Sequence, residues 1–330
     1  MTLADRVNTF GQVMLARYGE RVHKLAIDAG FTCPNRDGSK GRGGCTFCNN
    51  ASFSPNGREI SPVPMQIEAG RRVIARRTGA RKFIAYYQAY TNTYADPAQL
   101  KARYDEALAE PDVVGLSVGT RPDCVPPPVL DLLAAYRDQG HEVWLELGLQ
   151  SAFDRTLERV NRGHGFAEYR QAVRAARTRG LQVCTHLIVG LPGETTAHAR
   201  ISLERVLEEG GVSGLKLHPL HVVKGTRLAN AWRRGEYRPW SLEDYIHTAA
   251  DLVELTPAHL VFHRLTGTAP ANLLLAPAWC AHKWIVLNGI EHELSARGSH
   301  QGSRPWTQQS CCTTAREIRI RRPGFNVSAG

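Results

Sequence analysis

The feature that most constrains the fold is an alternation of short apolar runs with longer amphipathic segments between about residues 80 and 220. The runs are rich in β-branched residues and predict strands, whereas apolar residues spaced three and four apart predict helices. Such alternation is typical of a parallel sheet whose strands are joined by crossover helices. Strands are predicted over residues 24–29, 83–87, 113–118, 142–147, 183–189 and 214–217.

Six strands are compatible with more than one architecture of the α/β class. A closed eightfold barrel, a partial barrel and an open doubly wound sheet share the pattern, and six units favour a partial (β/α)6 barrel. Functional groups gather at the C-terminal ends of the strands in all three. The predicted helices that join the strands cover residues 66–77, 97–109, 128–139, 166–179 and 197–208.

The alternation also predicts the domain organisation. We expect an N-terminal helix over residues 1–17, a core domain over 18–265, a small C-terminal extension over 266–306 and a flexible basic tail over 307–330. No apolar run approaches the roughly 20 residues of a membrane span, and the N-terminus lacks the order of a signal peptide. We therefore expect a cytoplasmic protein.

Three of the eight cysteines, Cys33, Cys45 and Cys48, lie on one loop directly after the first predicted strand. In a reducing cytosol such grouping favours metal binding or catalysis over disulfides. Three thiolates on a four-iron cluster leave one iron without a protein ligand. The amine and carboxylate of S-adenosylmethionine (SAM) can chelate that iron, so that one-electron transfer yields a deoxyadenosyl radical. The three cysteines are thus predicted to bind a [4Fe–4S] cluster and to be catalytic.

A structural zinc site is the alternative for these thiols. Zinc in structural sites takes four protein ligands, usually supplied as two CxxC or HxxxH halves. No second half is visible in the sequence, although His23 or a distant thiol could serve as the fourth ligand.

Several longer motifs accompany the cysteines, and each begins where a predicted strand ends. They are residues 29–38 (AGFTCPNRDG), 43–48 (GGCTFC), 88–91 (QAYT), 119–124 (GTRPDC), 146–151 (ELGLQS), 190–195 (GLPGET) and 216–221 (KLHPLH). From about Tyr18 to Trp306, the chain resembles the YhcC-like radical SAM family, which is related to the radical domain of the Elongator catalytic subunit. The eleven residues between Cys33 and Cys45 exceed the usual spacing of radical SAM enzymes, but that insertion is the form of this family. By this resemblance Phe47 lies against the adenine, and Gln88 meets the methionyl amine where other members have a glycine-glycine-glutamate segment.

The third and fourth strand ends carry four further candidates for cofactor contact. Thr120 and Arg121 follow the third strand, where Arg121 could pair with a carboxylate of cofactor or substrate, or could only shape a turn with Asp123. Glu146 and Gln150 flank the end of the fourth strand. A carboxylate in an apolar strand needs a partner, which could be ribose hydroxyls, the methionyl amine or a structural ion pair with Arg121.

The fifth and sixth strand ends complete the predicted site. Gly190 and Glu194 are candidates for cofactor contact because glycine lets adenine approach the backbone; a strand-to-helix turn with Thr195 as N-cap is the alternative. His218 and His221 follow the sixth strand, where either could transfer a proton near neutral pH or be structural.

The other cysteines are assigned separately. Cys184 is predicted to be in the core, Cys124 and Cys280 are better placed for chemistry, and nothing beside Cys311 and Cys312 suggests a second cluster.

The substrate is the least constrained part of the prediction. A formal charge of +10 favours a polyanion such as RNA, whose flipped-out bases are held between aromatic and guanidinium planes. RNA or another macromolecule is therefore ranked above a small metabolite, and both above a cluster-bearing redox or interaction protein. An electron donor such as flavodoxin or ferredoxin is also expected. The candidate RNA contacts are the arginines at 71, 72, 76, 77, 233 and 234 and the tyrosines at 86, 87, 90 and 94.

Overall fold

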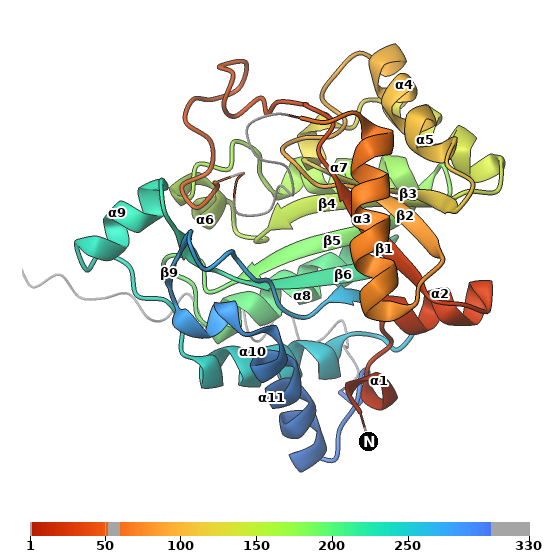
Figure 1. Ribbon diagram of the computed structural model, residues 1–330. Helices are drawn as coiled ribbons and strands as arrows, with labels where there is room; N and C mark the ends of the chain where they lie inside the picture. Colours follow the sequence, from red (N-terminus) through yellow and green to blue (C-terminus); the bar gives the residue numbers. More distant parts are fainter. Residues whose placement is uncertain (1, 50, 52–59, 305–330) are drawn as a thin grey trace, which may run out of the picture.

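The computed structural model describes residues 2–49, 51 and 60–304, and its centre is a seven-stranded parallel sheet. The sheet curls into a half-barrel, which confirms the predicted α/β partial barrel (Figure 1). Strand order follows chain order: β1 (Val22–Ile27), β2 (Lys82–Tyr87), β3 (Val113–Thr120), β4 (Glu142–Gln150), β5 (Gln182–Val189), β6 (Gly214–Pro219) and β8 (Val261–Arg264).

The number of strands differs from the six that the sequence predicted. The additional strand, β8, pairs in parallel with β6 and ends the sheet opposite β1. Its four residues, Val-Phe-His-Arg, contain two apolar side chains, which is too few for a strand periodicity to stand out. The half-barrel therefore extends one strand further, and Arg264 becomes part of its rim.

Six helices cover the outer face of the sheet. Their starts follow ordinary capping chemistry: the Asp96 carboxylate accepts the backbone N–H of Ala98 before α4, and Ser241 Oγ accepts that of Asp244 before α10. Apolar side chains between these helices and the strands form the main core. The helices are α3 (Val63–Thr78), α4 (Pro97–Leu108), α5 (Pro127–Asp138), α7 (Phe166–Arg177), α8 (Thr196–Glu209) and α10 (Leu242–Leu255).

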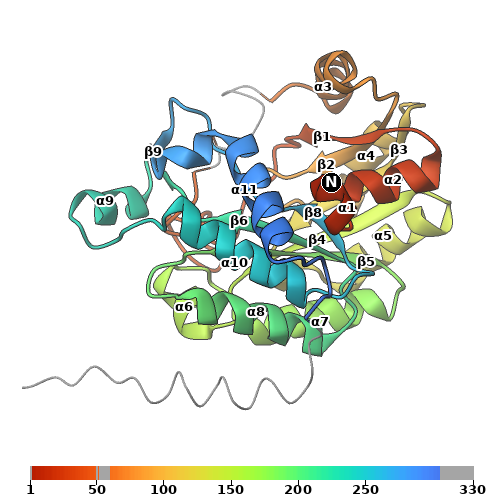
Figure 2. The same ribbon diagram turned by 90° about the horizontal axis from the view of Figure 1, so that it is seen from below.

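The N-terminal segment contains two helices: α2 (Phe10–Tyr18) lies beside β1 and β8, and α1 (Leu3–Arg6) lies beside α11 (Lys283–Ala296) (Figure 2). Phe10 and Met14 of α2 enter the interior of the half-barrel, where they pack in one cluster with Trp144 and Cys184. Cys184 is fully buried there, as predicted. This apolar layer fills the interior at the N-terminal ends of the strands and leaves the C-terminal ends for polar side chains.

The remaining elements lie around the C-terminal ends of the strands and beside α10. The antiparallel pair of β7 and β9 joins residues after β6 to the predicted C-terminal extension, whose helix α11 packs on α10. None of the helices in the described ranges combines the length and apolarity needed to cross a membrane. The predicted tail, with Cys311 and Cys312, lies outside these ranges. The elements are α6 (Asp154–Arg159), β7 (Val222–Val223), α9 (Arg227–Arg233), β9 (Leu274–Ala276), α11 (Lys283–Ala296) and two 3-10 turns at Pro122–Cys124 and Ala278–Ala281.

Candidate active site

A cavity of about 250 Å3 opens at the C-terminal ends of the strands, and it brings most of the predicted site residues together. The loop after β1 contributes all three clustered cysteines, and the ends of β2, β3, β4, β5, β6 and β8 contribute the rest of the wall. The predicted residues on the wall are Cys33, Cys45, Cys48, Phe47, Gln88, Thr120, Arg121, Glu146, Gln150, His218 and His221.

Gly190 and Glu194 are not among the residues that line this cavity. The Gly190 carbonyl accepts the hydroxyl of Tyr237 at 2.9 Å, and the Glu194 carboxylate accepts that of Ser151 at 2.5 Å. Thr195 is the N-cap of α8. The structure therefore favours the alternative of a strand-to-helix turn for this motif.

The three clustered cysteines are free thiols of different exposure. Cys45 is buried, whereas Cys33 and Cys48 are half-buried at the cavity wall. Gly44, directly before Cys45, has a φ of +70°, and a Cβ there would lie 2.9 Å from Nε of Arg36. The glycine thus allows the tight turn that presents Cys45 and Cys48 to the cavity.

The spacing of the thiols argues against the zinc alternative. Tetrahedral zinc with Zn–S bonds of about 2.3 Å places its sulfurs about 3.8 Å apart. Within the described residues, only Glu146, Cys184 and His186 bring three ligand atoms within 4.8 Å of one another, so the three Sγ atoms are more widely spaced. Neither His23 nor any of the other described thiols, the two alternatives for a fourth ligand, lines the cavity. Three separated thiols without a fourth ligand fit an iron–sulfur cluster, whose thiolates bind different irons.

The segment after α6 holds the cysteine loop in place, although it is about 117 residues away in the sequence. The Asn161 side chain donates to the Gly44 carbonyl at 2.8 Å, and the Asn161 carbonyl accepts Nδ2 of Asn35 at 2.5 Å. Nη1 of Arg162 lies 3.5 Å from Sγ of Cys45, and its Nη2 donates to the Gly148 carbonyl at 2.7 Å. We call Asn161 and Arg162 the loop clamp; sequence reasoning missed it, although the polar, glycine-containing stretch NRGHG was a usable signal.

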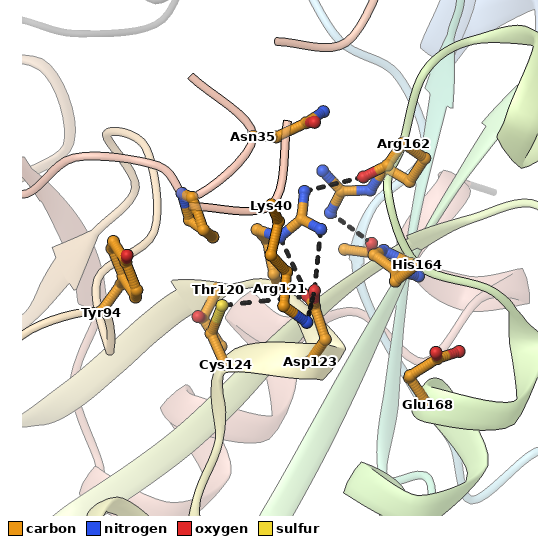
Figure 3. A network of polar contacts seen from close by, with 12 residues as sticks. Asn35, Lys40, Tyr94, Thr120, Arg121, Asp123, Cys124, Arg162, His164 and Glu168 are labelled. Carbon is orange, nitrogen blue, oxygen red and sulfur yellow. Dashed lines mark hydrogen bonds and ion pairs between the residues drawn. The ribbon is translucent and has the colours of Figure 1, made fainter. Parts of the chain in front are cut away.

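Arg121 is 2% exposed, and its guanidinium is occupied by protein groups (Figure 3). Its Nε and Nη2 each lie 2.9 Å from the Asp123 carboxylate, and its Nη1 donates to the Arg162 carbonyl at 2.8 Å. Burial alone would raise the pKa of Asp123, but Arg121 and Lys40 hold it well below its usual range. Within the described residues, Arg121 thus contacts the Asp123 turn and the loop clamp, while it also lines the cavity.

Glu146 lies at the floor of the cavity and is completely buried. The ammonium of Lys24 is 2.5 Å from its Oε1, the ammonium of Lys216 contacts its Oε2, and Nε2 of His186 is 2.7 Å from Oε2. The expected structural ion pair exists, but with these lysines instead of Arg121, because Arg121 is engaged by Asp123. Burial opposes ionisation of Glu146, yet Lys216 and Lys24 lower its pKa well below the usual value.

The two predicted proton-transfer histidines are half-buried, and each has one buried ring nitrogen without a partner in the described part of the chain. Nε2 of His218 and Nδ1 of His221 have no hydrogen-bond partner within the described ranges. Burial lowers the pKa of both rings, that of His218 well below its usual value, so both are neutral near pH 7. They line the cavity as hydrogen-bonding groups, not as imidazolium ions.

Backbone strain concentrates at the same place. Three non-glycine residues in the described chain have a left-handed φ: Tyr90 at 60°, Gln150 at 79° and Asn161 at 53°. Tyr90 and Gln150 line the cavity and Asn161 belongs to the loop clamp. Such conformations are unfavourable by about 1–3 kcal/mol and cluster at functional sites.

The remaining thiols predicted for chemistry are not in the cavity. Cys124 and Cys280 are buried, and burial raises the pKa of each to about 12. Cys124 lies on the wall of a separate hollow beside Lys40 and Tyr94. Both are protonated near neutral pH, which does not favour a role as nucleophile.

Comparisons with known proteins agree with a radical SAM site at the C-terminal ends of the strands. Residues 33–206 match the radical SAM superfamily, and residues 212–296 match the radical SAM C-terminal domain. Protein YhcC of Escherichia coli is 50% identical over 309 residues, which are 93% of this chain and 98% of that protein. This similarity confirms the resemblance seen in the motifs.

Two more distant similarities extend the comparison. The tRNA uridine(34) acetyltransferase of Methanocaldococcus jannaschii is 28% identical over 170 residues, 51% of this chain and 30% of that enzyme. The structure of Elp3 from Methanocaldococcus infernus has a TM-score of 0.63 at 19% identity, covering 86% of this chain and 64% of that chain, and shares the fold. The protein belongs to the radical SAM superfamily, whose enzymes use a [4Fe–4S] cluster and S-adenosylmethionine as cofactors.

Proposed function

We propose that Cys33, Cys45 and Cys48 hold a [4Fe–4S] cluster and that the protein cleaves SAM reductively in the adjoining cavity. The observation that carries the proposal is that the three thiols and six strand ends line one cavity. The cluster, when bound, supplies the electron that converts SAM to methionine and a 5′-deoxyadenosyl radical. An electron carrier such as flavodoxin or ferredoxin is the proposed source of that electron, in the cytoplasm.

Different residues of the cavity wall are proposed to contact different parts of SAM. Phe47 and Ile188 are partly buried, pack on the same apolar cluster and offer an apolar surface for the adenine. Gln88, Thr120 and Gln150 offer polar groups on the same wall for the methionyl and ribose parts. Glu146 fixes the positions of Lys24 and Lys216 at the floor of the cavity. We propose no cofactor contact for Gly190 or Glu194.

Anaerobic reconstitution tests this assignment. In the wild type, the iron and sulfide contents and the ultraviolet–visible and electron paramagnetic resonance spectra should show a cluster. Addition of reductant and SAM should then yield 5′-deoxyadenosine. Cys33→Ala, Cys45→Ala and Cys48→Ala should each abolish that product. Cys280→Ala is the matched control, because Cys280 is a buried thiol outside the cavity. Tight zinc binding without a cluster would overturn the proposal.

We further propose that the substrate is RNA or another macromolecule, of which one residue or base enters the cavity. Tyr90 is partly exposed at the cavity, and the Arg36 guanidinium lies 5.7 Å from its ring, an arrangement that suits stacking of a base. Arg76 and Arg77 are exposed in the last turn of α3, near the N-terminal ends of the strands, where only a polynucleotide that extends beyond the cavity would reach them. The chain carries a charge of +10. The name of the tRNA-modifying relative is consistent with this substrate class. Tyr86 and Tyr87, by contrast, are buried and cannot stack on RNA.

RNA affinity measured against salt concentration tests the substrate class. The double variant Arg76→Gln/Arg77→Gln should reduce the slope of log affinity against log salt by up to about two. The double variant Arg155→Gln/Arg200→Gln, which removes the same charge from α6 and α8, should leave the slope unchanged. No RNA affinity at low salt would shift the assignment to a small metabolite, which the modest cavity volume also admits. A cluster without SAM cleavage, even with candidate substrates present, would instead indicate a redox protein.

A further inference from the structure

We propose that Arg264, together with His218 and His221, forms a subsite in the cavity that binds an oxyanion, a phosphate or carboxylate group of the substrate. The end of β8 provides Arg264, and the end of β6 and the residues after it provide the histidines. That the bound anion belongs to the substrate rests on the proposed function. The anion site itself does not require SAM cleavage.

The first argument is the balance of charge on the cavity wall. Arg36 and Arg162 serve the cysteine loop, through the Cys48 carbonyl and Cys45 Sγ respectively, and Arg121 is paired with Asp123. Arg264 has no acidic partner among residues 2–49, 51 and 60–304. Arg264 is exposed at the mouth of the cavity, and among the described residues its charge is the one on the wall that no acidic or loop group takes up. The charged residues that line the cavity are four arginines, at 36, 121, 162 and 264, and one acid, Glu146.

The interior behind Arg264 is also positive. Lys216 is the register partner of Arg264 across β6 and β8, and it shares the Glu146 carboxylate with Lys24. One buried carboxylate thus faces two ammonium groups. The cluster and SAM together do not change this balance, because three thiolates on an oxidised [4Fe–4S] core leave a charge of about −1, which the net positive charge of SAM offsets. An anionic group of the substrate would restore the balance, and guanidinium groups bind carboxylate and phosphate in a bidentate manner.

The second argument is unused hydrogen-bonding capacity on the same wall. Nε2 of His218 and Nδ1 of His221 are buried and lack partners within the described residues. Gly267, on the loop after β8, lies so close that a Cβ would be 3.0 Å from Nδ1 of His218. Burial of a polar atom without a partner is unfavourable by about 1–3 kcal/mol. An oxyanion would provide acceptors for these rings and for Arg264 together.

Equilibrium dialysis of the cluster-loaded full-length protein against radiolabelled inorganic phosphate tests the subsite. We expect saturable binding of one phosphate at constant ionic strength. Arg264→Gln should weaken it about tenfold or more, because a hydrogen-bonded charge is lost, and Arg264→Lys should weaken it less. Arg81→Gln is the matched control, because Arg81 is 88% exposed at the opposite ends of the strands. His218→Gln provides a second variant on the other side of the subsite.

Competition identifies the anion. Displacement of phosphate by methyl phosphate but not by acetate would assign a phosphate group, and the reverse would assign a carboxylate; either result supports the subsite. Absence of saturable binding, or binding that Arg264→Gln leaves intact, would overturn it. Loss of SAM affinity in Arg264→Gln would also overturn it, because Arg264 would then serve the cofactor's carboxylate. Since dialysis needs neither reductant nor turnover, wild type that binds phosphate yet forms no 5′-deoxyadenosine would refute only the proposed function.

Discussion

The floor of the cavity, around Glu146, and its rim, at Tyr90, Gln150 and Arg264, differ in whether their polar groups have protein partners. At the floor, both oxygens of Glu146 have partners in Lys24, Lys216 and His186. At the rim, Tyr90 and Gln150 hold left-handed backbone conformations, and Arg264 lacks an acidic partner in the described chain. Satisfied groups stabilise the fold, whereas strain and unused donors are kept where a ligand is to bind. We therefore infer that the floor stabilises the fold and that the rim binds the ligand.

The largest effect that would test this contrast is at Glu146. Glu146→Gln leaves the ammonium groups of Lys24 and Lys216 buried without a counter-charge. Removal of one partner of a buried pair is destabilising by about 3–5 kcal/mol, so the free energy of unfolding in urea should fall by that order. Gln150→Ala at the rim should change it by less than about 1 kcal/mol. A similar loss in both variants would erase the distinction between floor and rim.

The free energy of unfolding should depend on pH through His186, which lies at the same floor. Burial lowers the pKa of His186 to about 4, although Glu146 acts in the opposite direction. The unfolded chain takes up this proton near the usual pKa of about 6.5, so between these values the unfolded state binds more protons and stability is lost as pH falls. The expected contribution between pH 7.5 and pH 5 is on the order of 1–2 kcal/mol. His186→Gln should lose less stability than the wild type over this interval in urea titrations at the two pH values; an equal loss would contradict the assignment.

Arg162 in the loop clamp should control the redox properties of the site. Its guanidinium lies 3.5 Å from Cys45 Sγ, and a donor and positive charge beside a cluster ligand favour the reduced state. Arg162→Gln should lower the midpoint potential of the reconstituted cluster by on the order of tens of millivolts. Potentiometric titration followed by electron paramagnetic resonance measures this shift, and Arg162→Lys should restore part of it. An unchanged potential with a less stable cluster would show that Arg162 only positions the loop.

The features that were predicted from the sequence depend on local patterns, and those that were missed depend on contacts between distant residues. The strands, the thiol cluster and the rim residues at strand ends were predicted because parallel strands direct their C-terminal ends to one edge. The partners of Glu146 were not, because Lys24 and Lys216 come from strands three and two positions away, respectively, across the curled sheet. The loop clamp was missed for the same reason, since Asn161 reaches Gly44 over 117 residues. Local periodicity identifies elements, whereas side-chain pairs depend on how the sheet curls.

The smallest expected effect concerns strain at the rim. Tyr90 has a φ of 60° and is 37% exposed, so its ring contributes little packing and its backbone is unfavourable. Tyr90→Ala keeps the strain, whereas Tyr90→Gly relieves about 1–2 kcal/mol of it and loses about 0.5–1 kcal/mol to chain entropy. The glycine variant should therefore unfold at higher urea concentration than the alanine variant, by a difference of about 0.5–1 kcal/mol, while both lose RNA affinity equally. If the alanine variant were the more stable one, the rim would not be strained at Tyr90, and the contrast with the floor would rest on Arg264 and the two histidines alone.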